Sequence, residues 1–288
     1  KRMVDYRIHA FLALYETMNY HRAAERLQIS QPAVSQQIRG LENQYGCKLF
    51  CYDGRRLQRT DAADKLAEYA RSALYNERQF RRELDRTDQK EVRLGATRTI
   101  GEYALGPALC RYVQHSSENL TVTVDNTAVL LDKLDLGELD FALVEGVFDK
   151  KRYGYRLYQK AEFTGMCHHT HPFANRTVSL EDLSGQSVVL REKGSGTRAI
   201  FEDVLEENGH SLSLFSRVIC ASSFSLIMRF VREGAGITFA YAAVAEGSPD
   251  IARFALDCLP AKREFNVVFL KGTRAEELAC RVLDDFPY

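Results

Sequence analysis

The strongest constraint on this chain is a set of helical signals in its first sixty residues. Apolar side chains recur at helical spacing in residues 8–15 and 20–27, and the segment 23–38 predicts two short helices around a tight turn. Ser30 is a good N-cap for the second of these helices, and Pro32 lies in its first turn, where a missing amide proton costs little. This spacing is that of a helix-turn-helix, whose second helix can enter a DNA major groove.

The helix that follows Ser30 is predicted to end at Gly46 and to have two different faces. Val34, Ile38 and Leu41 form its apolar face, and the opposite face carries short polar side chains, an amide and a guanidinium. Such groups bond base edges and phosphates. A hairpin around an Asp-Gly turn, with arginines near its tip, is predicted to follow. The side chains expected to contact DNA are Ser30, Gln31, Pro32, Ser35, Gln36, Arg39, Arg55 and Arg56.

Charge separates these sixty residues from the rest of the chain. They hold ten Lys or Arg against five Asp or Glu, a net charge of +5. The whole chain has 39 of each kind, so residues 61–288 carry −5. A basic head on an acidic body is typical of a nucleic-acid reader joined to a domain without that role. An ordinary helical bundle with solvated charges is the alternative interpretation.

A dense set of motifs lies between residues 22 and 50: Arg22-Ala23-Ala24-Glu25-Arg26-Leu27, Ser30-Gln31-Pro32-Ala33-Val34-Ser35, Leu41-Glu42, Gly46 and Leu49-Phe50. Through these motifs, residues 11–63 closely resemble the DNA-binding domain of LysR-type transcriptional regulators, and the similarity extends over the rest of the chain. The resemblance implies a multidomain fold: an all-α winged helix-turn-helix head and a long linker helix, then an α/β two-lobed periplasmic-binding-protein-like domain. Gln36 departs from the family, which usually has a basic residue there.

A single long helix is predicted over residues 60–88, capped by Thr60. Its apolar positions follow coiled-coil spacing, which favours pairing with a second copy, although the same seam could pack on the chain's own body. The resemblance implies a dimerising linker here, and we expect a homodimer or homotetramer. Polar residues 87–90 are expected to form a hinge. The seam consists of Leu66, Ala70, Ala73, Glu77, Phe80 and Leu84.

From Val92 onward strand and helix signals alternate, which predicts a parallel sheet built from βαβ units. Strands are expected at 92–96, 120–124, 141–144, 163–168, 187–190, 217–220 and 264–270, and helices near 102–116, 128–137, 197–208, 223–234 and 275–285. The expected division is a DNA-binding head over 1–60, a linker helix over 61–88, a first lobe from 92–161 and 264–288, and a second lobe over 162–263.

Hydroxyl and amide side chains follow several predicted strands, where the next helix begins. Sheets of this kind bind ligands beyond the carboxyl ends of their strands, and helix N-termini with such groups suit a carboxylate, sulfate or phosphate. The same residues also cap empty helices, so each junction alone is a weak signal. The resemblance matches Thr97, Thr99, Asn126, Thr127, Ser195, Thr197 and Ser222 to regions that contact an effector.

Arg98 is not typical of the family, in which this position is usually small. We expect that it either forms a salt bridge with Glu145 or Glu192, or clamps an anionic effector. These three residues therefore complete the expected effector-binding set.

Several other classes of site have weak support. The seven cysteines form no CxxC, which suggests buried thiols in a reducing cytoplasm, with a Cys167–Cys220 redox pair as the alternative. Cys167 and the histidines at 168, 169 and 171 resemble a zinc cluster only loosely, so no metal is expected. The glycines at 194 and 196 lack a phosphate-loop ending, and no catalytic motif occurs, so neither a cofactor nor an enzyme activity is expected.

The chain is therefore expected to be a cytoplasmic, sequence-specific transcription regulator. Its partners would be double-stranded promoter or operator DNA and a small effector, expected to be anionic in view of the helix N-termini. RNA polymerase is a further candidate partner. No run of about 18 apolar residues indicates a membrane span, and the basic start does not resemble a signal peptide. The alternative is a solute-binding or enzymatic module with a degenerate DNA-binding head.

Overall fold

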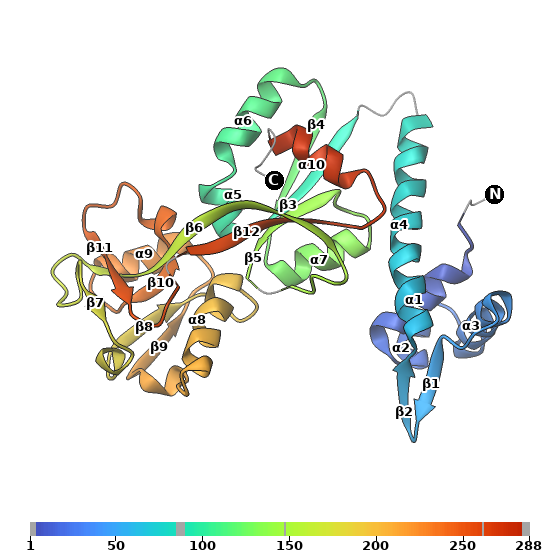
Figure 1. Cartoon of the computed structure of the whole chain (residues 1–288), viewed down its shortest axis with the longest axis horizontal. Coiled ribbons are helices and arrows are strands. Elements are labelled where there is room, and N and C mark those ends of the chain that lie inside the picture. Colours follow the sequence, from blue (N-terminus) through green and yellow to red (C-terminus); the bar gives the residue numbers. More distant parts are fainter. Residues whose placement is uncertain (1–3, 85–89, 147, 261, 284–288) are drawn as a thin grey trace. The chain divides into compact units, whose positions relative to one another are not determined.

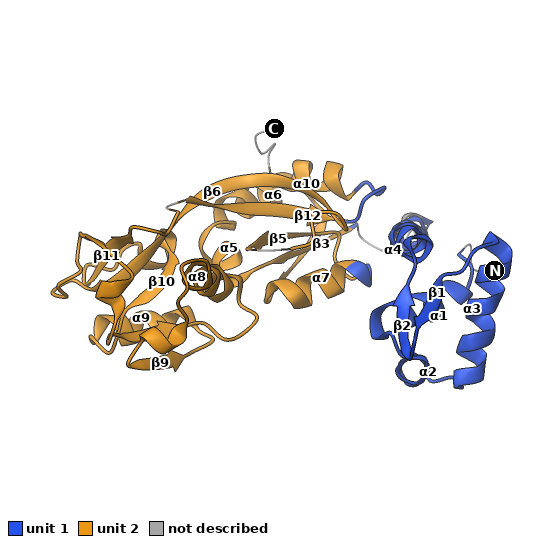
Figure 2. Cartoon of the chain, turned by 60° about the horizontal axis from the view of Figure 1, so that its bottom comes forward, with its two compact units in different colours: residues 1–90, 135–137, 270–274 blue, residues 91–134, 138–269, 275–288 orange. Residues whose placement is uncertain are grey.

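The computed structural model describes residues 4–84, 90–146, 148–260 and 262–283. The chain divides into two compact units, which are coloured separately in Figure 2. The first unit comprises residues 1–90 with the short segments 135–137 and 270–274, and the second comprises the remainder. The expected hinge falls mostly on residues 87–89, outside the described residues.

Three helices open the first unit: α1 (Arg7–Thr17), α2 (Tyr20–Leu27) and α3 (Gln31–Tyr45). Local chemistry sets the limits of α3. The Ser30 hydroxyl accepts a hydrogen bond from the amide of Ala33 at 3.3 Å, and Pro32 lies in the first turn. Gly46 ends the helix with a φ of +65°, a conformation that glycine adopts without strain.

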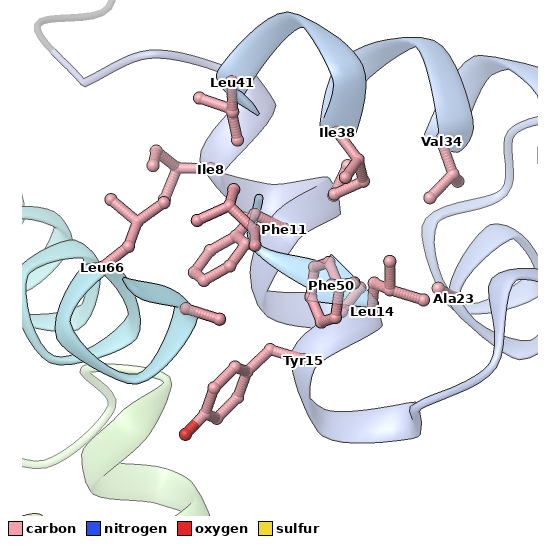
Figure 3. Close-up of a cluster of buried hydrophobic side chains, with 14 of the residues drawn as sticks. Ile8, Phe11, Leu14, Tyr15, Ala23, Val34, Ile38, Leu41, Phe50 and Leu66 are labelled. Atoms are coloured by element: carbon pink, nitrogen blue, oxygen red, sulfur yellow. The ribbon is translucent and has the colours of Figure 1, made fainter. Parts of the chain in front are cut away.

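The core of this unit brings together α1, α3 and the long helix α4 (Asp61–Leu84), as Figure 3 shows. Phe11 and Leu14 of α1 are fully buried, and Val34 and Leu41 of α3 pack against them. Ala23, also fully buried, lets α2 approach α1 closely. The predicted apolar face of α3 is thus inside the core, which directs its opposite face to solvent.

The wing is a two-stranded antiparallel sheet of β1 (Phe50–Asp53) and β2 (Arg56–Arg59). Glu42 of α3 joins the wing to the helix. Its carboxylate accepts a hydrogen bond from the amide of Leu49 at 3.0 Å and forms an ion pair with the Lys48 ammonium group at 2.8 Å. Although burial acts to raise it, these bonds hold the pKa of the Glu42 carboxyl below its ordinary value. Glu42 therefore positions the wing relative to α3.

Helix α4 (Asp61–Leu84) follows the wing. The Thr60 hydroxyl accepts from the amide of Ala63 at 3.2 Å, as expected of its N-cap. The predicted seam has two environments. Leu66 and Ala70 are buried in the core of this unit, whereas Phe80 and Leu84 are 45% and 64% exposed. The first half of the seam thus packs on the chain itself, and the second half is open to solvent.

The second unit is built on an eight-stranded mixed sheet with the order β4-β3-β5-β12-β6-β11-β7, in which β10 also pairs with β6. Its first lobe contains β3, β4 and β5, all parallel, and β12, antiparallel to β5. The expected parallel βαβ arrangement of β3, β4 and β5 is therefore confirmed, and β12 adds an antiparallel strand to it. The bounds are β3 (Glu91–Ala96), β4 (Asn119–Val124), β5 (Phe141–Glu145) and β12 (Lys262–Phe269).

Strand β6 (Gly154–His168) connects the lobes and is visible as a long ribbon in Figure 1. Its first half pairs with β12, and its second half pairs with β10 and β11 of the second lobe. Only residues 163–168 were predicted as strand, because the first half carries many exposed polar side chains that hide its period.

Four helices cover the strands of the first lobe. They are α5 (Arg98–Tyr103), α6 (Gly106–His115), α7 (Thr127–Asp135) and α10 (Ala275–Leu283). Figures 1 and 2 show α6 and α10 on one side of the sheet and α7 on the other. The single helix expected over 102–116 was wrong, because Pro107 lies in the first turn of α6 and cannot continue the hydrogen-bonded ladder of α5.

The second lobe contains a smaller parallel pair, β8 (Ser187–Leu190) and β9 (Arg217–Cys220), with helices α8 (Gly196–Glu207) and α9 (Phe224–Arg232). Three strands of this lobe were not predicted: β7 (Thr177–Val178), β10 (Thr238–Tyr241) and β11 (Ile251–Leu256). Short 3₁₀ turns lie at Glu181–Leu183, Leu212–Leu214 and Ala242–Ala245. Met166 of β6 and Phe224 of α9 belong to the buried core of this lobe.

Candidate functional site

The polar face of α3 is the first candidate site. Gln31, Pro32, Gln36 and Arg39 are exposed, and Ser35 is half-buried. The Ser30 hydroxyl oxygen accepts the N-cap hydrogen bond, and the residue is exposed, so DNA could contact its outer side. A helix that presents amides and a guanidinium to solvent, with its other face locked in a core, has the form required to enter a major groove.

Three arginines on α3 and the wing have no carboxylate partner among the described residues. Within the described ranges, Arg39, Arg55 and Arg56 are exposed and form no ion pair. Arg26 of α2, by contrast, is paired with Glu16 at 2.5 Å. An unpaired guanidinium keeps its donors available for phosphate or guanine.

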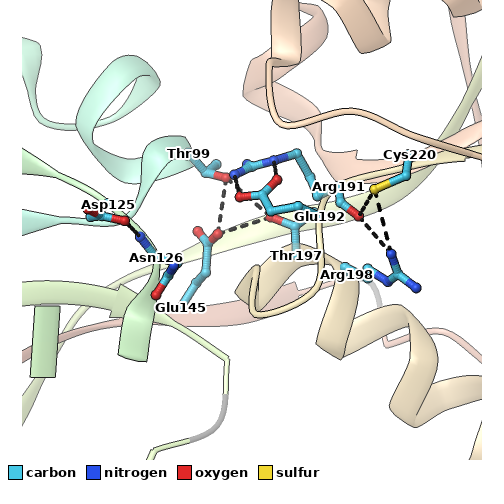
Figure 4. Close-up of polar contacts among 9 residues, drawn as sticks. All are labelled: Thr99, Asp125, Asn126, Glu145, Arg191, Glu192, Thr197, Arg198 and Cys220. Atoms are coloured by element: carbon cyan, nitrogen blue, oxygen red, sulfur yellow. Dashed lines mark hydrogen bonds and ion pairs between the residues drawn. The ribbon is translucent and has the colours of Figure 1, made fainter. Parts of the chain in front are cut away.

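The second candidate site lies in the second unit, where β3 and β5 end side by side. Since parallel strands place their carboxyl ends at one edge, Thr97 and Thr99 after β3 come close to Glu145 at the end of β5. The Thr99 hydroxyl donates to the Glu145 carboxylate at 3.2 Å. Figure 4 shows this contact among its polar neighbours.

The second lobe contributes the start of α8 to the same place. The Thr197 hydroxyl donates to Oε1 of Glu145 at 3.0 Å and lies 3.5 Å from the Thr99 hydroxyl. A Cβ on Gly196 would lie 2.9 Å from the carbonyl oxygen of Glu145, so glycine permits this close approach of two backbones. Glu145 therefore joins the two lobes through hydroxyls from each.

Buried polar atoms at this junction lack partners. Thr97, Glu145 and Thr197 are each at most 3% exposed. Oγ1 of Thr97, Oε2 of Glu145 and the hydroxyl of Tyr241 have no partner in hydrogen-bonding geometry among the described residues. A buried unsatisfied group is costly, so each such atom requires an explanation. We call Thr97, Thr99, Glu145, Thr197 and Tyr241 the interlobe cluster.

The electrostatics of Glu145 differ from those of an ordinary carboxylate. Burial raises its pKa to about 7, although the hydroxyls of Thr197, Thr99 and Thr97 and the charge of Arg191 act in the opposite direction. Burial also raises the pKa of Tyr241, and the nearby Glu145 carboxylate adds to that effect. An ionised Glu145 therefore disfavours ionisation of Tyr241.

Arg98 forms neither of the salt bridges expected for it. It has no ion pair with a described residue, and the Glu192 carboxylate is held instead by Arg191, with both contacts at 2.8 Å. Although burial acts to raise it, these contacts hold the pKa of Glu192 below its ordinary value, with a further contribution from the charge of Arg98. Arg191 is adjacent to Glu192 in the chain and pairs with it, so Arg98 has no ion pair with a described residue near the cluster.

The other predicted effector residues occupy different positions. The Thr127 hydroxyl donates to the backbone carbonyl of Glu145 at 3.4 Å, and Asn126 caps α7 by accepting from Val129 at 3.0 Å. Ser195 is buried at the start of α8, without a side-chain capping bond. Ser222 is exposed, unlike the members of the interlobe cluster.

Two residues of the site escaped sequence reasoning. Tyr241 lies at the end of β10, a short buried strand that was not predicted. Its aromatic and β-branched run, Thr238 to Tyr241, was the available signal. Arg191 is buried, and its guanidinium lies 4.6 Å from the ring centre of Phe224.

Neither the cysteines nor the histidines form a visible centre. None of the seven cysteines forms a disulfide in the described structure, and within the same residues no three His, Cys, Asp or Glu side chains are placed to hold a metal ion. No described helix combines the length and apolar character needed to cross a membrane.

Two family models match the chain. The first, described as LysR substrate binding domain, matches residues 85–284. The second, described as bacterial regulatory helix-turn-helix protein, lysR family, matches residues 6–64. Together they cover both candidate sites.

Individual relatives agree with these matches. The chain is 32% identical over 204 residues to the HTH-type transcriptional regulator CysL of Bacillus subtilis, which covers 69% of this chain and 68% of CysL. A solved structure of a mutant OxyR of Corynebacterium glutamicum, bound to hydrogen peroxide, superposes with a TM-score of 0.60 at 24% identity, covering 96% and 89% of the two chains. The regulatory domain of Synechocystis CcmR, solved in complex with 2-PG, has a TM-score of 0.61 at 18% identity, covering 68% and 97%. These structures share the fold.

Proposed function

Because the chain belongs to the LysR family of bacterial transcriptional regulators, we propose which of its surfaces perform the two tasks of such a protein. The chain is a DNA-binding regulator with an effector-binding domain. In our proposal, α3 and the wing read the duplex, and the interlobe cluster binds a small anion. The residues assigned to DNA are Ser30, Gln31, Pro32, Ser35, Gln36, Arg39, Arg55 and Arg56.

One observation carries the DNA assignment: among the described residues, Arg39 on the exposed polar face of α3 has no carboxylate partner, and neither have Arg55 and Arg56 of the wing. Amides such as Gln31 and Gln36 can read base edges, and the arginines can also hold phosphates. Asp53, across the turn from Arg56, forms no ion pair with it in the described structure.

The test is the salt dependence of binding to fragments from the chain's own genomic neighbourhood. With three arginines per protomer, a dimer would neutralise about six phosphates, and log K against log salt should fall with a slope of about −5. We expect one fragment to be preferred over a scrambled duplex at every salt concentration. A flat salt dependence and no preference for any fragment would remove the DNA assignment and favour a solute-binding or enzymatic module.

For the effector, we propose an anion held by Thr97, Thr99, Thr197 and the amides at the start of α8. The Thr97 hydroxyl supports this, because it is buried, has no acceptor in full hydrogen-bonding geometry among the described residues, and lies close enough to Glu145 to lower the pKa of that carboxyl. The CcmR domain solved with 2-PG supports a small ligand in this fold. Arg98, Asn126, Thr127, Glu145, Glu192, Ser195 and Ser222 complete the proposed surroundings. Such a ligand changes DNA contacts only if it binds one conformation better than the other.

We further propose that the exposed half of α4 pairs with a second copy. Phe80 and Leu84, four residues apart, lie on one helix face with Tyr69, which is 67% exposed. Replacing both Phe80 and Leu84 by glutamate should weaken self-association by at least about 100-fold, because two apolar side chains lose their burial. Analytical ultracentrifugation measures this, and Phe80→Leu is the control that should still associate. An unchanged assembly in the double variant would show that this face does not pair.

The remaining assignments follow from this function. We propose that the chain acts in the cytoplasm, where its DNA lies, that it has no enzyme activity or cofactor, and that RNA polymerase is a further partner. The proposed division is a reader over 1–60, a linker over 61–88, a first lobe from 92–161 with 264–288, and a second lobe over 162–263.

A further inference from the structure

In the interlobe cluster, the protein's own carboxylate occupies the donors that an anion would use. The hydroxyls of Thr99 and Thr197, one from each lobe, both point to Oε1 of Glu145, as Figure 4 shows. Gly196, at the start of α8, approaches the backbone of Glu145 closely. An anion bound by these groups would therefore lie beside a second negative group.

Three atoms of the cluster have no partner in full hydrogen-bonding geometry among the described residues, and they set the chemistry that a ligand there would need. The hydroxyls of Thr97 and Tyr241 can each donate a hydrogen bond, and Oε2 of Glu145 can accept one. The Thr97 hydroxyl also lies close enough to Glu145 to lower the pKa of its carboxyl. All three belong to buried side chains, each at most 3% exposed. A ligand that satisfies all three needs oxygen acceptors and also one hydrogen to give to Glu145.

The charged groups around Glu145 do not replace the hydrogen that a ligand would have to give to its carboxylate. Arg191, at the end of β8, attracts it but forms its ion pair with Glu192. Tyr241 of β10 is neutral at ordinary pH, because burial and Glu145 both raise its pKa. The groups that α5 and α8 direct at the carboxylate are the uncharged hydroxyls of Thr99 and Thr197. No described cation forms an ion pair with Glu145.

We propose that Glu145 is a specificity residue: the interlobe cluster accepts anions that carry a hydrogen-bond donor and excludes those without one. The inference rests on the proposed effector site and names its ligand class, an oxyanion that keeps a hydroxyl hydrogen. An anion without such a hydrogen binds only when Glu145 itself is protonated, because one hydrogen must lie between the two oxygens. A site built to bond a ligand hydroxyl rejects the analogue that lacks it, since its own acceptor would stay unpaired.

Proton linkage follows from this arrangement. The pKa of Glu145 is raised to about 7, so the carboxyl is largely protonated below that pH and ionised above it. An anion without a hydrogen should therefore lose affinity as the pH rises above about 7, by up to about tenfold per pH unit. An anion that brings its own hydrogen should not lose affinity in this way.

Inorganic phosphate and sulfate are the matched probes, because at pH 8.5 both are tetrahedral dianions and only phosphate keeps a hydrogen. Isothermal titration calorimetry of the full chain, at constant ionic strength, should give phosphate at least about tenfold tighter binding than sulfate at pH 8.5. Sulfate should bind more tightly at pH 6, and above pH 7 it should take up about one proton, measured by comparing buffers of different ionisation enthalpy.

Glu145→Gln tests the assignment directly, because its amide can donate where the carboxylate can only accept. In this variant sulfate should bind within about threefold of phosphate, without proton uptake and without the pH dependence. Glu162→Gln is the matched control, since Glu162 is half-exposed and paired with Arg253 at 3.0 Å. It should keep the discrimination of the wild type.

The outcomes separate the two proposals. Equal binding of both anions to the wild type at pH 8.5, with no proton uptake, would overturn the role of Glu145 and leave the anion site standing. The same discrimination in Glu145→Gln as in the wild type would also overturn it. No heat from either anion with either protein, from pH 5.5 to 8.5, would overturn the anion site itself.

Discussion

An Arg39→Ala variant should bind its preferred DNA fragment at least about tenfold more weakly than the wild type, with a smaller loss on scrambled duplex. Arg39 projects from the exposed face of α3, opposite Val34 and Ile38, which are buried. It has no ion pair in the described structure, so its removal leaves no carboxylate without a partner. Fluorescence anisotropy with both duplexes at one fixed salt concentration measures the effect, and Gln31→Ala should weaken specific binding as well.

The matched control for this prediction is Arg26→Ala. Arg26 is a partly exposed arginine of the same unit, but it belongs to α2 and is paired with Glu16 of α1. Its replacement should change affinity for either duplex by less than about threefold, as expected of a surface pair. If Arg39→Ala binds as well as the wild type, or if both variants lose affinity equally, α3 does not read the groove.

The second large effect is on stability. Glu145→Gln should stabilise the second unit at alkaline pH, because the wild type must bury an ionised carboxylate there. The folded pKa of about 7 lies above the ordinary value of 4.5. The protonated Glu145 therefore makes its full contribution to the free energy of unfolding below about pH 4.5, and this contribution is lost as the pH rises through about 7. The loss amounts to about 3 kcal/mol.

Thermal unfolding of the full chain at pH 5 and pH 8.5 tests this prediction. At about 2–4 °C per kcal/mol, the variant's transition should lie about 5–10 °C above that of the wild type at pH 8.5. The two should nearly coincide at pH 5, since glutamine can accept the same hydroxyl bonds from Thr99 and Thr197. The control Glu162→Gln should follow the wild type at both pH values. A difference between Glu145→Gln and the wild type that is equal at both pH values would contradict the raised pKa.

Local patterns predicted the first unit well. Helices α1 to α3 and the wing depend on short-range signals, such as Ser30 at a helix start and Gly46 at a helix end. Long-range pairing limited the prediction for the second unit. The polar first half of β6 and the short strand β10 become strands because their neighbours pair with them.

The candidate sites divide in the same way. The hydroxyls of Thr97, Thr99 and Thr197 could be proposed from their places at helix starts, and the structure brings them together. A salt bridge of Arg98 with Glu145 or Glu192 was one of its two expected roles, yet Arg191 pairs with Glu192 because it is adjacent in the chain and buried. The other expected role, a clamp on an anionic effector, stays a prediction. Tyr241 could not be placed without its strand.

Capping, periodicity and charge act over a few residues, so the order of residues alone determined the helix-turn-helix with its polar, basic face and the alternation of strands and helices in the body. The division of that body into two lobes was implied by the family resemblance. Tertiary structure decided that Glu145 is enclosed between the lobes, that half of the α4 seam is used internally, and that Arg98 has no ion pair among the described residues. Burial and charge pairing depend on segments that are far apart in the chain. The chemical character of the interlobe cluster therefore exists only in the folded protein.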